Sequence, residues 1–123
     1  MKDEAYLKML GTAVWESPVP IYVIHVEVDE AGKPVDWRFA YANEAEAKHL
    51  SIPLEKLLGR SGIELSPKIG GKWLFPYYEA AYHGKTLDFD TFARRTKRVI
   101  HLHIMPAGTP GYCLASIRNF DKT

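Results

Sequence analysis

The sequence changes from a strand pattern to a helix pattern within VDWRFAYANEAE, residues 35–46. In the first half of this stretch the aromatic residues Trp37, Phe39 and Tyr41 alternate with smaller or polar side chains. Because successive side chains of a strand point to opposite faces, the alternation predicts a strand over 35–42 with its three rings on one face.

Asn43 stands where the alternation ends. An Asn side chain at a helix N-cap accepts a hydrogen bond from a backbone N–H two or three residues further on. Glu46 lies three residues after Asn43, as in a capping box, so a short helix is predicted here. A second short helix is expected with Pro53 in its first turn and Gly59 as the C′ residue. The serine and glutamate of 61–64 repeat the capping arrangement for a third.

The segment before this stretch predicts a partner strand. Residues 21–28 are rich in Val, Ile and Tyr, which favour strands. The polar residues 29–33 include Gly32, which suits a turn position of positive φ. Together with the strand over 35–42, they predict a β-hairpin.

The second half of the chain predicts one longer helix and three strands. After a loop at Gly70-Gly71, a helix is expected over 72–83, with Pro76 in its first turn and Gly84 at its end. The strands are expected over 86–93, 98–105 and 111–120.

The N-terminal segment predicts a flanking helix. Apolar residues recur at helical spacing within about 3–15, and Pro18 and Pro20 then prevent helix continuation. The order is a helix, two strands, several short helices and three strands. It predicts an α+β fold, a five-stranded antiparallel sheet with helices packed on one face.

Several local strings resemble the PAS family of sensory domains. YANEA (41–45) resembles the family's start of the first core helix, and LEKLLGR (54–60) resembles its next helix with the terminal glycine. The segment 100–112 matches its last hairpin. RNFD (118–121), or DKT in an alternative register, resembles the junction that closes these domains.

The resemblance implies a domain organisation and a role. It covers 18–123 as the PAS sensory domain and leaves 1–17 as the flanking helix. It implies a sensory module that controls a C-terminal output domain, a diguanylate cyclase or a histidine kinase, and it implies no catalytic activity. The opening of the domain is most similar to modules linked to diguanylate cyclases.

A ligand site is expected between the sheet and the helices, because PAS sensors hold ligands there. Such a site is lined mostly by apolar groups. The alternative is that the same residues only fill a core. The candidate ligand-binding residues are Tyr22, Ile24, Phe39, Tyr41, Leu57, Trp73, Tyr77, Ile100 and Leu102.

The sequence requires no cofactor. His83 could supply a haem ligand, but a His at a helix end also favours the helix dipole, which is the interpretation we favour. The family's covalent flavin needs Asn-Cys-Arg on a core helix, and Cys113 lies on a predicted strand, so covalent flavin is excluded. His101 and His103 share one strand face and lack further ligands at a convincing spacing for zinc. We expect them on the sheet exterior and predict no metal site.

Composition narrows the partners and the compartment. The net charge of +1 indicates no general attraction to nucleic acid or to an anionic membrane. No apolar stretch is long enough for a membrane span. A single cysteine rules out an internal disulfide, so a reducing, cytoplasmic setting is the simplest expectation.

Two other functions remain open at this point. A cone-shaped enzyme of the ketosteroid-isomerase type would use Asp88 or Asp90 as a base, although its long helices would precede most of the sheet. A ligand-free interaction module would form a homodimer through the N-terminal helix and the outer sheet face. The PAS interpretation accounts best for the order of elements.

Overall fold

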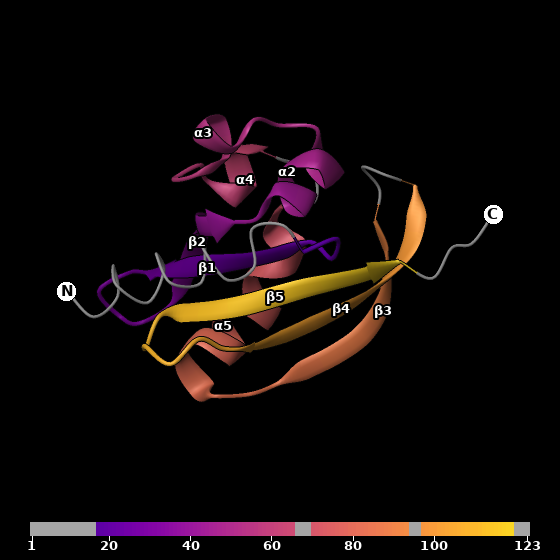
Figure 1. The fold of residues 1–123 in the computed structure, drawn as a ribbon. Helices are drawn as coiled ribbons and strands as arrows, with labels where there is room; N and C mark the ends of the chain where they lie inside the picture. Colours follow the sequence, from indigo (N-terminus) through magenta and orange to yellow (C-terminus); the bar gives the residue numbers. More distant parts are fainter. Residues whose placement is uncertain (1–16, 66–69, 94–96, 120–123) are drawn as a thin grey trace.

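Five strands form one antiparallel sheet in the order β2-β1-β5-β4-β3 (Figure 1). The computed structural model describes residues 17–65, 70–93 and 97–119. The expected helix over 3–15 and the end of the predicted junction therefore lie outside the described residues. The elements are β1 Ile21–Val28, β2 Pro34–Ala42, α2 Glu44–Leu50, α3 Leu54–Leu57, α4 Gly62–Leu65, η1 Gly70–Trp73, α5 Leu74–His83, β3 Leu87–Ala93, β4 Arg98–Pro106 and β5 Tyr112–Asn119.

The helices pack on one face of the sheet and close the main core. In Figure 1, α2, α3 and α4 gather beside β2, and α5 crosses behind the sheet. Helix α5 contacts β1, β2, β4 and β5. Side chains of these strands that face α5 are buried with it, among them Ile24, Phe39, Ile100 and Leu102. The predicted α+β fold with a five-stranded antiparallel sheet is confirmed.

The prediction that Trp37, Phe39 and Tyr41 share one face of the strand was wrong for Tyr41, because the register of β2 against β1 is irregular. The register pairs Val23 with Tyr41 but Ile24 with Phe39, so Ala40 is an extra residue in β2. An extra residue reverses the alternation of side chains beyond it. Phe39 therefore faces the main core, whereas Tyr41 packs with Val23 and Ala107 in a separate cluster on the other face of the sheet.

The longest internal helix also differs from its prediction. Helix α5 begins at Leu74, and the preceding residues 70–73 form a 3₁₀ turn instead of a loop followed by α-helix. Pro76 is the third residue of α5, where a backbone N–H has no partner within the helix. The predicted end is confirmed, because Gly84 caps α5 in the left-handed conformation with φ 68°. No helix in the part of the chain described is long and apolar enough to span a membrane.

Candidate functional site

Three elements bring polar side chains together inside the main core. Tyr22 comes from β1 and Tyr77 from α5, and their hydroxyl oxygens lie 2.8 Å apart. Both rings are buried and meet edge to face. Glu46 comes from α2 and is only 2% exposed. We call Tyr22, Glu46 and Tyr77 the core polar cluster.

The Glu46 carboxyl takes no part in the cap of α2, which Asn43 provides. The Asn43 side-chain oxygen accepts from the Glu46 backbone N–H at 3.0 Å, which confirms the predicted cap. The Asn43 backbone N–H, however, donates to the carbonyl of Ile21. A capping-box glutamate would bind that N–H, so the Glu46 carboxyl is displaced from the expected role. Its Oε1 is buried without a hydrogen-bond partner.

Burial dominates the electrostatics of the cluster. It raises the pKa of Glu46 well above its usual value and so favours the protonated carboxyl. Burial, the neighbouring phenol and the charge of Glu46 raise the pKa of Tyr22. The pKa of Tyr77 is also raised, chiefly by burial and with a contribution from Glu46. Burial therefore favours the uncharged form of all three side chains.

The structure brings most of the predicted site residues together. Seven of the nine candidates belong to the buried main core, and Trp73 packs against its edge from the 3₁₀ turn. Tyr41 does not join them, since it lies on the opposite face. Sequence reasoning missed Glu46 as a core residue, having assigned it only to the cap. The seven buried candidates are Tyr22, Ile24, Phe39, Leu57, Tyr77, Ile100 and Leu102.

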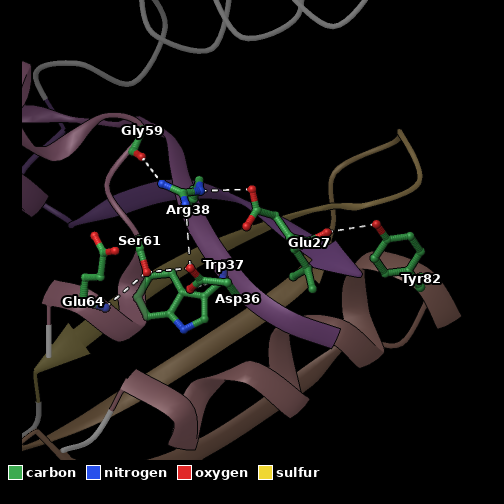
Figure 2. A network of polar contacts seen from close by, with 9 residues as sticks. Glu27, Asp36, Trp37, Arg38, Gly59, Ser61, Glu64 and Tyr82 are labelled. Carbon is green, nitrogen blue, oxygen red and sulfur yellow. Dashed lines mark hydrogen bonds and ion pairs between the residues drawn. The ribbon is translucent and has the colours of Figure 1, made fainter. Parts of the chain in front are cut away.

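A second polar network fastens the short helices to the edge of β2 (Figure 2). Arg38 donates to Glu27 at 3.0 Å and to the Gly59 carbonyl at 2.8 Å. Ser61 donates to Asp36 at 2.6 Å and accepts from the first turn of α4. A β-bridge joins Arg38 to Ser61. The segment after α3 thus runs along β2 and attaches α3 and α4 to this strand.

The outer face of β3 and β4 carries a ladder of acidic and imidazole side chains. His101 contacts Asp90 through Nδ1 at 2.8 Å and Asp88 through Nε2, and His103 Nδ1 lies 3.1 Å from Asp88. The expected exterior placement of both histidines is confirmed. The Asp88 and Asp90 side chains are at least half exposed, a poor setting for a base in an apolar pocket. No group of three or more such residues in the described ranges is arranged to hold a metal ion.

The residues considered for cofactors lie as follows. His83 ends α5 with a half-exposed side chain, and its Nδ1 lies 3.5 Å from Glu79. It therefore takes part in a surface contact instead of pointing into the core. Cys113 is buried in β5 on the core side. Burial raises the pKa of its thiol, so it is an unreactive neutral group.

Comparison with solved structures identifies the fold. No protein-family model matches the chain, and no curated protein is similar to it in sequence. A domain of an HTR-like protein from Haloarcula marismortui superposes with a TM-score of 0.67 at 14% identity, covering 85% of this chain and 100% of that one. The PAS domain of Bordetella pertussis BvgS gives 0.66 at 16% identity, covering 96% and 88%.

A domain of a sensory box sensor histidine kinase from Vibrio cholerae gives a TM-score of 0.62 at 12% identity, covering 99% of this chain and 100% of that one. All three likenesses extend over most of both chains, and the strand order and the helices between β2 and β3 account for them. The chain has the PAS fold.

Proposed function

We propose that this chain is a sensory or regulatory domain of a signal-transduction protein that binds a small ligand in its main core. One observation carries the proposal, the buried Glu46 carboxyl whose Oε1 has no partner. A ligand that reaches this oxygen would satisfy it and would contact two helices and the sheet at once. The domain is proposed to act by binding and not by catalysis.

The energetics support a ligand at Glu46. A buried polar group without a hydrogen bond costs about 1–3 kcal/mol of stability. Native cores hold few such groups, and each one calls for an explanation such as a bound molecule. Strongly perturbed carboxyls in protein interiors also gather at functional sites.

The neighbours support a signalling role. BvgS contributes a PAS domain, and the Vibrio cholerae domain belongs to a sensor histidine kinase. By analogy, residues 18–123 would form the sensory domain, 1–17 a flanking helix, and an output domain of the histidine kinase or diguanylate cyclase type would follow. A cytoplasmic setting fits this arrangement.

A second candidate function is a dimerisation module that needs no ligand. The outer face of the sheet exposes Phe92, Val99 and Met105, and Phe92 is 51% exposed. Exposed apolar side chains on one face favour association with another surface. Such a homodimer would use this face and the flanking helix. A chain starting at Ser17 that stays fully dimeric in sedimentation would contradict the part assigned to that helix.

Native mass spectrometry with an absorbance scan tests the ligand proposal. The purified chain is expected to carry a stoichiometric extra mass, which Glu46→Leu loses. Glu44→Gln is the matched control, because Glu44 lies in the same helix with its side chain half exposed. A bare chain mass for the unmodified protein would contradict a tightly bound ligand and would favour the ligand-free dimer.

A further inference from the structure

We infer that the ligand of the core polar cluster is an uncharged small molecule whose carbonyl or similar oxygen accepts a hydrogen bond from Glu46. The inference rests on the proposed function and adds the chemical class of the ligand. Three features of the described core lead to it: the polar groups that are already satisfied, the absence of buried cations, and the donors left over in the cluster.

Most buried polar groups are already satisfied. Besides Glu46, the buried polar or charged residues of the described ranges are Asn43 and Ser61. Asn43 donates to the Val19 carbonyl and accepts from two backbone N–H groups. Ser61 is held between Asp36 and the first turn of α4. Of these three residues, Glu46 is therefore the one that has bonding capacity left for a ligand.

The charge of the core argues against an ionised ligand. Within ranges 17–65, 70–93 and 97–119 no Lys, Arg or His is among the buried residues. An anion at Glu46 would enter an apolar core without a countercharge, which is strongly unfavourable. A cation could pair with Glu46 only after the carboxyl lost its proton, and both charges would then be removed from water.

The proton of Glu46 determines what the site offers. The Glu46 carboxyl is buried, its Oε1 has no partner, and no cation is buried among the described residues, so burial favours the neutral form, which presents one O–H donor. In the Tyr22–Tyr77 pair one hydroxyl donates to the other, which leaves the proton of the second available. The neutral cluster therefore offers two O–H donors, one from Glu46 on α2 and one from the tyrosine pair. A carbonyl oxygen has two lone pairs and matches this arrangement without any change of charge.

Four phenyl compounds of similar size test the class of ligand. Acetophenone offers a neutral carbonyl, benzoate a negative charge, benzylamine a positive charge, and ethylbenzene no polar group. Each is titrated into the isotope-labelled chain, and dissociation constants come from the NMR shifts of residues 22, 46 and 77. Acetophenone is expected to bind at least about tenfold more tightly than ethylbenzene, the effect of one buried hydrogen bond.

Two variants separate a hydrogen bond from an ion pair. Glu46→Leu removes the donor and is expected to weaken the binding of acetophenone at least about tenfold. Glu46→Gln keeps an N–H donor and is expected to weaken the binding of acetophenone by about threefold at most. If benzylamine bound through an ion pair with an ionised Glu46, its binding would instead be lost in both variants. Glu44→Gln serves as the control on the exposed side of α2.

The outcomes distinguish this inference from the proposal on which it rests. If benzoate or benzylamine bound most tightly at the core residues, the inference that the ligand is uncharged would be overturned. The proposal of a ligand site in the core would still stand. A co-purified molecule found by native mass spectrometry tests the same point. An uncharged molecule supports the inference, and an ionised molecule overturns it. A bare mass with no core shifts from any probe overturns the proposed function, and this inference with it.

Discussion

The phenol oxygens of Tyr22 and Tyr77 lie 2.8 Å apart in the core, although 55 positions separate the two residues in the chain. The bond joins β1, the second strand in the sheet order, to the helix that covers the sheet. Because each hydroxyl is buried, each depends on the other for its hydrogen bond. The pair therefore fixes α5 against β1, and the geometry of the candidate site depends on it.

Tyr77→Phe is expected to lower the free energy of unfolding by about 1–2 kcal/mol, because it leaves the Tyr22 hydroxyl buried without a partner. Urea denaturation measures the change. Adding Tyr22→Phe should recover part of the loss, since both polar groups are then gone. Tyr78→Phe is the control, with an exposed hydroxyl that bonds to the Gly32 carbonyl, and should change stability by about 0.5 kcal/mol or less. Equal losses at 77 and 78 would contradict the buried pair.

Glu46 should make stability depend on pH in a defined direction. Its pKa is raised in the folded state above the ordinary value of 4.5, so the folded chain holds the proton more tightly than the unfolded chain. The resulting stabilisation is complete below 4.5 and is lost as the pH rises toward the raised pKa. Glu46→Gln carries no such proton.

The stability of Glu46→Gln relative to the unmodified chain should therefore increase with pH above about 4.5, by at most about 1.4 kcal/mol per pH unit. Urea denaturation between pH 4.5 and 8 measures both proteins, and Glu44→Gln provides the comparison at an exposed site. A difference that stays constant across this range would mean that Glu46 is not held protonated by burial.

Gly62 lies where α4 meets Trp37. A Cβ at this position would run into the Trp37 ring, so Gly62→Ala is expected to destabilise the fold by about 1–3 kcal/mol, as overpacking does. Gly71→Ala meets nothing within 4 Å and should be close to neutral. Thermal unfolding of the two variants compares them directly, and similar midpoints would show that α4 does not pack so closely on β2.

Ser61 connects the β2 edge to α4. Ser61→Ala removes a hydroxyl that donates to Asp36 and caps the helix, so a loss of about 1–2 kcal/mol is expected. Hydrogen exchange should also quicken within α3 and α4. Ser17→Ala removes a hydroxyl that accepts from Val19 at the surface and serves as the control. If the exchange rates in these helices did not change, the claim that the Ser61 hydrogen bonds attach α3 and α4 to β2 would be contradicted.

The sequence predicted the strands and most helix ends to within about one residue, because local patterns determine them. The Val, Ile and Tyr content placed β1 at the observed bounds, and the glycines at 59 and 84 end helices with positive φ as expected. Helix α5 was misjudged at its start, where glycine and proline allow more than one kind of turn. These local features account for the correct fold.

Features that depend on distant partners were not predicted. Tyr41 lies on the face opposite the main core because of an irregularity in the pairing of β2 with β1. The sequence of β2 alone does not contain this irregularity. Glu46 cannot complete a capping box, because the Asn43 N–H donates to the carbonyl of Ile21, 22 positions earlier. The contacts of His101 with Asp88 and Asp90 need the register of β3 against β4. No single local pattern contains this information.

Infrared difference spectroscopy of the chain with and without acetophenone tests the central claim, a protonated Glu46 that binds the ligand, most directly. The account predicts a carbonyl stretching band of a protonated carboxyl that moves to lower frequency when acetophenone is added and that is missing from Glu46→Gln. A band that is absent from the unmodified chain, or that does not move on addition of acetophenone, would contradict the account.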